Sequence, residues 1–176
     1  MDFGGGPLAQ FILDQVQDLG DELIIISNQP QDYKQFGVPV YTDVYPGIGA
    51  LGGLYSAISH AKYDYCLVLA CDMPFVSRPL IAYVISLAPE FDAVIPRLDE
   101  NEFVEPFRAV YKKSCLSSIE RAIQSKQRRV IAFFNDVNIR FLDQSEIEVY
   151  DPDGRSFFNI NTPADLQRAR SLLDPN

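Results

Sequence analysis

The sequence predicts an α/β fold with a largely parallel sheet. Continuous apolar runs at 23–26 and 65–70 are typical of strands that are covered on both faces. Segments with apolar residues at helical spacing alternate with such runs, as they do in α/β proteins. No internal repeat or linker interrupts the 176 residues, and we therefore expect a single domain over 1–176.

Helix and strand boundaries follow from local signals along the chain. The first helix is expected to begin after Pro7 and to end at Gly20. Ser77 is expected to cap a later helix that has Pro79 in its first turn, and Thr162 to cap the last one. The further strands are expected at 38–42, 92–96, 103–111, 139–142 and 157–160, and the further helices after a glycine-rich turn at 46–53 and around 114–125 and 128–135.

Composition excludes several classes of function. The chain has 24 acidic and 15 basic residues, a net charge of −9, which disfavours a nucleic-acid partner. The basic cluster at 126–129 suits a small anionic ligand better. The three cysteines of the chain form no CxxC pair, and this favours reduced thiols in the cytoplasm. No apolar run approaches the ~20 residues of a membrane span.

Asp72 is the strongest candidate for chemistry because it lies just beyond the end of the buried strand at 65–70. Its carboxylate either caps the turn at 74–77 or lies in the crevice where α/β sheets bind ligands. In the second case it would hold Mg²⁺, which typically uses one or two carboxylates together with substrate phosphates. Asn28 and Asp43 also follow predicted strands, and we expect them at the same edge of the sheet.

Two further segments are suggestive. The glycine-rich turn at 47–53 lacks the Walker pattern, and it is either a tight connection or a place where backbone approaches a ligand. Asn159 and Asn161 alternate along the predicted strand at 157–160 and just after it, which would point both amides the same way. The segment around Glu105 and Arg108 is more typical of a solvated face. His60 is the only histidine, so Ser-His-Asp or Cys-His hydrolysis is disfavoured.

Taken together, these segments resemble the molybdenum cofactor guanylyltransferase (MobA-like) family. The Cys-Asp-Met-Pro-Phe sequence at 71–75 is shared by several kinds of nucleotidyltransferase, whereas the segment at 158–166 is more specific. The likeness covers nearly the whole chain, through Asp43 and the segments 46–54, 71–75, 106–111, 128–130 and 158–166.

The resemblance implies a three-layer α/β/α, Rossmann-like fold of the GT-A-like nucleotidyltransferase kind. It implies transfer of GMP from Mg·GTP to molybdopterin-bound molybdenum cofactor, with a molybdoenzyme or a cofactor-delivery protein as partner. Asp72 would be the catalytic metal ligand for Mg²⁺. The residues implied to bind the nucleotide are Asn28, Asp43, Gly49, Gly52, Gly53 and Asp72, and those implied to bind molybdopterin are Asn159, Asn161 and Arg108.

The chain also departs from the family pattern. The family more often has Gly-Pro-Leu-Ala-Gly where this chain has Gly-Ala-Leu-Gly-Gly at 49–53, which leaves a nucleotidyltransferase that uses CTP or a sugar phosphate as an alternative. A first strand and a glycine-rich triphosphate loop normally precede the segment that matches 3–8. Without the central strand we expect two unpaired strand edges. Without the loop, which would grip the triphosphate, we expect little or no transfer activity. A misassigned start codon and a truncated, inactive nucleotide- or pterin-binding module both account for this departure.

Overall fold

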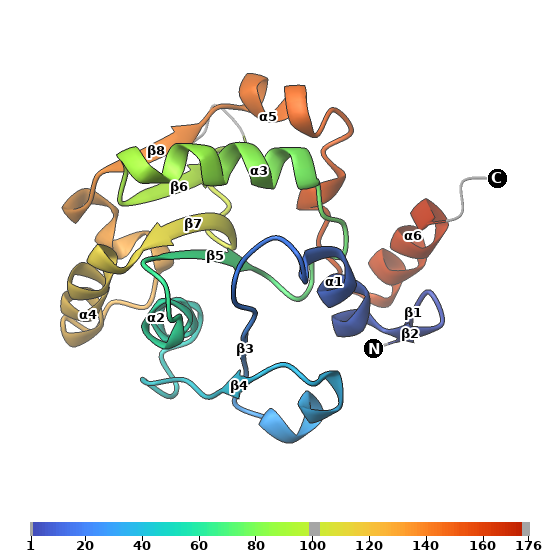
Figure 1. Cartoon of the computed structure of the whole chain (residues 1–176), viewed down its shortest axis with the longest axis horizontal. Coiled ribbons are helices and arrows are strands. Elements are labelled where there is room, and N and C mark those ends of the chain that lie inside the picture. The colour runs from blue at the N-terminus through green and yellow to red at the C-terminus, as the bar shows by residue number, and fades with distance from the viewer. Residues whose placement is uncertain (1, 99–102, 174–176) are drawn as a thin grey trace.

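The computed structural model describes residues 2–98 and 103–173, and its main sheet has four strands (Figure 1). Their order across the sheet is β5 (Tyr65–Leu69), β7 (Arg108–Lys112), β6 (Ala93–Pro96) and β8 (Ile139–Leu142). β7 is antiparallel to both neighbours, and β6 is parallel to β8. It follows that β5, β6 and β8 all run in one direction and that β7 alone is reversed.

One reversed strand among four agrees with the expected largely parallel sheet, whereas β7 is shorter than the strand predicted at 103–111. Parallel neighbours need a long crossover, usually through a helix, whereas antiparallel neighbours can be joined directly. In the described part of the connection from β6 to β7 there is no helix, only a bridge between Arg97 and Val104. The chain therefore returns beside β6 in the opposite direction, with Val94 opposite Val110.

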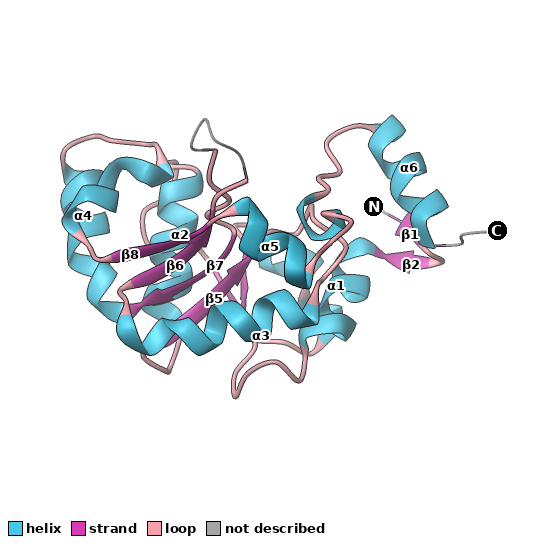
Figure 2. Cartoon of the chain, turned by 90° about the horizontal axis from the view of Figure 1, so that it is seen from above, coloured by secondary structure: helices cyan, strands magenta, loops and turns pink. Residues whose placement is uncertain are grey.

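Helices cover both faces of this sheet (Figure 2). One face packs against α2 (Ala50–His60) and α4 (Leu116–Gln124), and the other against α3 (Arg78–Leu87) and α5 (Gln144–Tyr150). Side chains alternate between the faces, as the period of a strand requires. Ile95 and Tyr111 belong to the first cluster, whereas Val94 and Val110 belong to the second. The expected three-layer α/β/α arrangement is confirmed.

Capping residues set several helix ends. The Ser77 hydroxyl accepts a hydrogen bond from Leu80 N, as predicted. At α6 (Pro163–Leu173) the Thr162 hydroxyl accepts from Asp165 N at 3.1 Å, while the Asp165 carboxylate accepts from Thr162 N at 2.9 Å. The helix predicted around 128–135 is a 3₁₀ segment, Val130–Asp136. In the described ranges no helix has the length and apolarity needed to span a membrane.

The strand predicted at 157–160 does not form. A short 3₁₀ turn, Arg155–Phe157, is followed by irregular chain up to α6. A strand needs a neighbouring edge to bond to, and in the described chain no strand is paired with this segment. Ile160 N instead donates to the Asp72 carbonyl at 2.8 Å, and so the segment is held against the loop that follows β5.

The two ends of the described chain pack together, apart from the main sheet (Figure 2). A small hairpin of β1 (Asp2–Phe3) and β2 (Gly6–Pro7) leads into α1 (Leu8–Val16). Phe3 and Ile12 form a separate apolar cluster with Ala169 of α6 and with Ile160. This cluster places the 157–162 segment next to the Asp72 loop.

The remaining two strands are not hydrogen-bonded to the main sheet. β3 (Ile25–Ile26) and β4 (Val40–Tyr41) form a parallel pair of their own. A largely apolar cavity of about 570 Å³ lies between them and β5, lined by residues 23–28 and 66–72 together with parts of α1 and α2. Among the described residues, β5 pairs with β7 alone, and β3 and β4 form a sheet separate from it.

Hydrogen exchange should report which strand edges are free. Ala70 N donates to Phe107 O and Lys113 N to Asp64 O, so in β5 the even-numbered residues bond to β7. The amides of Leu67 and Leu69 therefore point to the opposite, open edge. We expect them to exchange on the order of a hundredfold faster than those of Cys66 and Val68, measured by amide NMR. Equal protection of both pairs would show that the open edge has a partner.

Candidate active site

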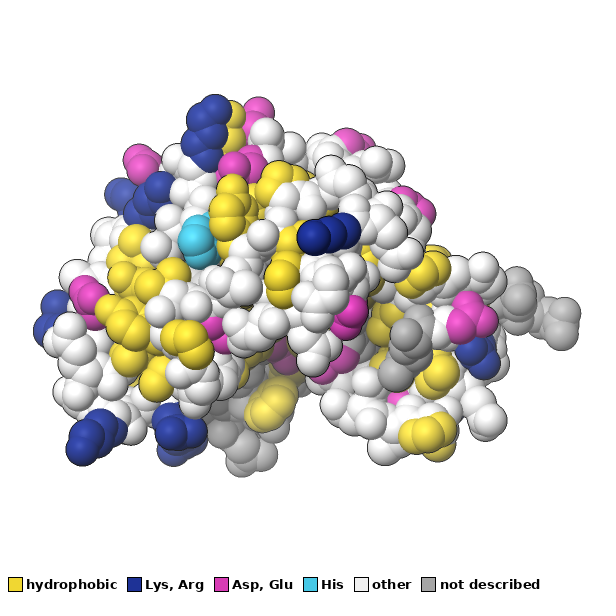
Figure 3. Space-filling model, turned by 90° about the horizontal axis from the view of Figure 1, so that it is seen from below, with side chains coloured by type: hydrophobic (Ala, Val, Ile, Leu, Met, Phe, Trp, Pro, Cys, Tyr) yellow, Lys and Arg dark blue, Asp and Glu magenta, His cyan; other side chains and the backbone are white. Residues whose placement is uncertain are grey.

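Three predicted residues lie around the cavity between β3 and β5. Asn28 follows β3, Asp43 follows β4 and Asp72 follows β5, and all three side chains line the cavity. Figure 3 shows a hollow between the larger and the smaller part of the molecule, with acidic side chains in magenta at its border. We expected these residues at the same edge of one sheet; the strands that they follow belong to two sheets, but all three residues line one cavity.

Asn28 and Asp43 fix one another. The Asn28 side-chain Nδ2 donates to Asp43 Oδ2 at 2.7 Å, and Asp43 N donates to Asn28 Oδ1 at 3.0 Å. Buried Ser56 on α2 holds the next residue, because its hydroxyl accepts from Val44 N and donates to Gly52 O. The Asp43 carboxylate is thus held at the rim of the cavity by a strand, a turn and a helix.

The carboxylate of Asp72 is not a turn cap. Its Oδ1 is buried and has no hydrogen-bond partner. In the turn at 74–77, Pro74 has no N–H group, and Val76 N donates to the side chain of Gln15 at 3.2 Å. A buried polar atom without a partner is costly unless something else binds it. Of the two alternatives for Asp72, the structure therefore favours a ligand-binding carboxylate.

Asp72 has two neighbours with the same property. The buried side-chain atoms that lack a hydrogen-bond partner, within the described ranges, are Asp72 Oδ1, Arg108 Nε and Nη1, and Asn159 Oδ1. Arg108 Nη2 donates to Met73 O at 3.1 Å, and Ile160 N donates to Asp72 O at 2.8 Å. Backbone contacts thus bring the three residues to one loop. An anionic, a cationic and an amide group lie there, each with at least one buried atom that has no hydrogen-bond partner.

The burial of Arg108 and Glu105 corrects the expectation of a solvated face. Arg108 is 2% exposed and Glu105 is 7% exposed. Burial lowers the pKa of Arg108 to about 10, while the nearby Glu105, Asp151 and Asp72 carboxylates act to raise it. Arg108 therefore stays protonated at neutral pH. Burial raises the pKa of Glu105, and Phe107 N, which donates to its carboxylate, acts in the opposite direction.

The glycines of the turn at 47–53 have different roles. Gly49 has φ +80° and ψ −144°, a conformation that only glycine adopts readily, and it begins α2. A Cβ on Gly52 would lie 3.0 Å from both Tyr45 O and Ile48 Cβ, so this glycine allows close packing. Gly53 lines the cavity, and its missing Cβ would point to Asp43 Oδ1 at 4.0 Å. Only Gly53 of the three borders the cavity.

Asn159 and Asn161 do not present a matched pair of amides. With no strand there, Asn159 is half-buried against the Asp72 loop, whereas Asn161 is exposed. Asn161 N donates to the Asp165 carboxylate at 3.2 Å, as part of the start of α6. The expected common direction of the two side chains is therefore wrong, because it assumed a period of two.

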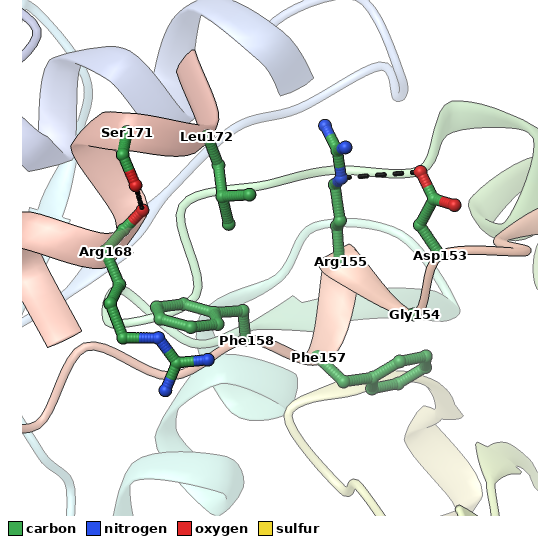
Figure 4. Close-up of a pocket in the computed structure, with 8 residues that line it drawn as sticks. All are labelled: Asp153, Gly154, Arg155, Phe157, Phe158, Arg168, Ser171 and Leu172. Atoms are coloured by element: carbon green, nitrogen blue, oxygen red, sulfur yellow. Dashed lines mark hydrogen bonds and ion pairs between the residues drawn. The ribbon is translucent and has the colours of Figure 1, made fainter. Parts of the chain in front are cut away.

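Neither the second cavity nor the histidine adds to this site. A hollow of about 610 Å³ lies beside α6 and contains none of the predicted site residues (Figure 4). There Arg168 lies over the Phe158 ring at 5.4 Å, and Arg155 pairs with Asp153 at 3.4 Å. The only histidine, His60, stacks on Tyr41 with ring centroids 4.4 Å apart at the far end of α2. Chemistry that depends on histidine has no support here.

The residues around Asp72 fit a loosely held divalent cation. No group of three or more His, Cys, Asp or Glu side chains converges to hold a metal in the described part of the chain. A hard cation such as Mg²⁺ needs fewer, because it keeps several waters and shares substrate phosphates. Asp72 Oδ1, buried at the cavity and without a partner, suits that mode of binding.

Comparison with known proteins points to one family. The family model of the MobA-like NTP transferase domain matches residues 1–139. A relative from Clostridium perfringens, described as a probable molybdenum cofactor guanylyltransferase, is 37% identical over 144 residues, which is 81% of this chain and 72% of that protein. The molybdenum cofactor guanylyltransferase of Desulfosudis oleivorans is 31% identical over 97% of this chain and 89% of its own length.

Solved structures agree on the fold. The molybdopterin-guanine dinucleotide biosynthesis protein A of Archaeoglobus fulgidus superposes with a TM-score of 0.86 at 25% identity, covering 100% of this chain and 90% of its own. The 2-C-methyl-D-erythritol 4-phosphate cytidylyltransferase of Thermus thermophilus gives a TM-score of 0.72 at 18% identity, over 98% of this chain and 91% of its own. The second likeness concerns the fold alone.

Proposed function

Because this chain belongs to the MobA-like NTP transferase family, we propose that it transfers GMP from GTP to molybdopterin-bound molybdenum cofactor. Membership of this family makes the chain a nucleotidyltransferase of molybdenum cofactor biosynthesis. The choice of GTP and of the acceptor rests on the names of the relatives. The observation that carries a catalytic role is the buried, unpartnered Asp72 Oδ1 beside the cavity.

The reaction requires little covalent chemistry from the side chains of the protein. A phosphate oxygen of the acceptor would attack the α-phosphorus of GTP, and the bond to the β-phosphate would break to release pyrophosphate. Positioning and charge neutralisation are then the main tasks. Mg²⁺, when bound by Asp72, would neutralise charge on the phosphates. The absence of a suitably placed histidine is consistent with this chemistry, because the acceptor is itself the nucleophile.

Different residues of the chain would bind the nucleotide and the pterin. We assign Asn28 and Asp43 to the nucleotide, because their mutual hydrogen bonds fix polar groups at the rim of the cavity. Gly53 leaves room beside Asp43 for the nucleotide to approach. Asn159 and Asn161 are assigned to the pterin side. Arg108 is out of reach of solvent, so its contribution to that side would be indirect.

A transfer assay tests the proposal. The chain is incubated with α-³²P-labelled GTP, Mg²⁺ and molybdenum cofactor, and labelled molybdopterin guanine dinucleotide is separated from free nucleotide. We expect label on the cofactor from GTP and at least tenfold less from CTP. The rate is expected to be low, because the open cavity beside Asp72 admits water.

Two results would contradict the proposal. Equal labelling from CTP would reject the assignment of the base. Tight GTP binding, with no label on the cofactor in a reaction that a homologous enzyme completes, would instead identify a nucleotide-binding module. The second result would leave the family assignment intact, since family members can lose activity and keep the fold.

A further inference from the structure

The loop that carries Asp72 rests on a buried arginine. Arg108 lies on β7 directly opposite Leu69, the last residue of β5, and is 2% exposed. Its guanidinium reaches under the loop, where Nη2 donates to Met73 O at 3.1 Å. The other two nitrogens, Nε and Nη1, have no hydrogen-bond partner. Among the described residues, the bond to Met73 O is the one hydrogen bond that this side chain donates.

Stability alone does not explain an arginine at this position. The following residues of β7, Ala109, Val110 and Tyr111, are buried and pack into the two apolar clusters. An arginine with two unpaired donors pays a large desolvation cost that an apolar side chain there would avoid. Packing therefore does not account for this side chain, and its positive charge is the feature that remains to be explained.

The charges around Arg108 identify that use. Glu105, Asp151 and Asp72 are the carboxylates that act on it. The Glu105 carboxylate already accepts from Phe107 N, and the Asp151 carboxylate from the backbone and hydroxyl of Ser156. Asp72 Oδ1 has no partner of its own. Of these three carboxylates, Asp72 is the one with a buried oxygen that has no partner, and its charge acts on Arg108 without a direct hydrogen bond between them.

We propose that Arg108 is a positioning residue that serves as the built-in counter-charge of Asp72. It holds the loop through Met73 O, and its charge tunes the site so that a cation binds only moderately and an anionic nucleotide is attracted. The inference rests on the proposed function, in which Asp72 is the metal ligand. It predicts that removing the charge affects a cation and an anion in opposite directions, which loss of structure cannot do.

Binding of each ion separately tests this inference. The variants are Arg108→Gln, which removes the charge, and Arg108→Lys, which keeps it. Free Mn²⁺ is measured by electron paramagnetic resonance, and labelled GTP is measured by equilibrium dialysis in the presence of EDTA. For Arg108→Gln we expect about tenfold tighter Mn²⁺ binding and about tenfold weaker binding of metal-free GTP. Arg108→Lys should stay within about threefold of the parent for both.

A matched control is available on the surface. Arg78 likewise donates from its guanidinium to a backbone carbonyl, that of Gln15 at 2.9 Å, but it is exposed and paired with Asp18. Arg78→Gln should change neither affinity. Circular dichroism shows whether each variant is folded. If Arg108→Gln does not fold, Arg108→Lys decides, because a shift of more than threefold in either affinity would overturn the counter-charge role.

The remaining outcomes separate this inference from the proposed function. Asp72→Asn should abolish the Mn²⁺ site. If Mn²⁺ binding does not depend on Asp72, the proposed function fails. If it depends on Asp72 but Arg108→Gln weakens both ligands, or shifts neither, only the counter-charge inference is overturned.

Discussion

Replacing Asp72 with asparagine should lower GMP transfer on the order of a thousandfold without destabilising the chain. The loss follows because an amide oxygen is a poor substitute for the carboxylate that would hold the metal and its phosphates. Stability should not fall, since Asp72 Oδ1 has no hydrogen bond to lose. Relief of the buried, unpartnered oxygen is offset by the loss of its attraction to Arg108, so the free energy of unfolding is expected to change by less than about 1 kcal/mol.

Both halves of this result are measurable on the same protein. Transfer is followed with labelled GTP, and the free energy of unfolding with urea. Asp153→Asn is the matched control, because Asp153 is exposed and lies in the hollow beside α6, away from the other site residues. If Asp72→Asn kept its transfer rate, or lost more than about 2 kcal/mol of stability, the side chain would be structural.

The position of Asp72 was predictable because the signal is local. An apolar run long enough for a buried strand, with a carboxylate shortly after it, places that side chain near a strand end. The same rule placed Asn28 and Asp43, and the three residues do line one cavity. What each side chain bonds to was not predictable, because the Asn28–Asp43 pair joins residues 15 apart that only the β3–β4 ladder brings together.

The errors arose where a local pattern depends on a distant partner. Asn159 and Asn161 alternate as they would in a strand, but a strand exists only where another edge accepts its hydrogen bonds. Arg108 and Glu105 looked solvent-facing because they are charged, although the apolar residues that follow Arg108 in β7 indicated burial. Helix α5 was not predicted, although it had a local signal: Asp143 and Glu146 form a capping box at its start.

The second large effect should come from adding one methyl group to α2. Gly52→Ala is expected to lower the free energy of unfolding by about 2–3 kcal/mol. The new Cβ would lie 3.0 Å from Tyr45 O and 3.0 Å from Ile48 Cβ, and neither is the free end of a flexible side chain. To relieve the clash, the turn at 45–48 must move away from the helix. Because Asp43 precedes this turn, nucleotide binding should weaken too.

Gly53→Ala is the matched control, since the two glycines are adjacent in the same helix. At Gly53 the nearest atom to a new Cβ is Asp43 Oδ1 at 4.0 Å, so the methyl group fits. Alanine also favours a helix over glycine by about 1 kcal/mol, and the fold should be at least as stable. The methyl group points toward the cavity, however, and we expect about tenfold weaker GTP binding.

Urea unfolding and equilibrium dialysis measure the two effects. If both alanines changed stability alike, the close packing at Gly52 would not be what requires glycine. If Gly53→Ala bound GTP normally, the nucleotide would not approach this face of α2.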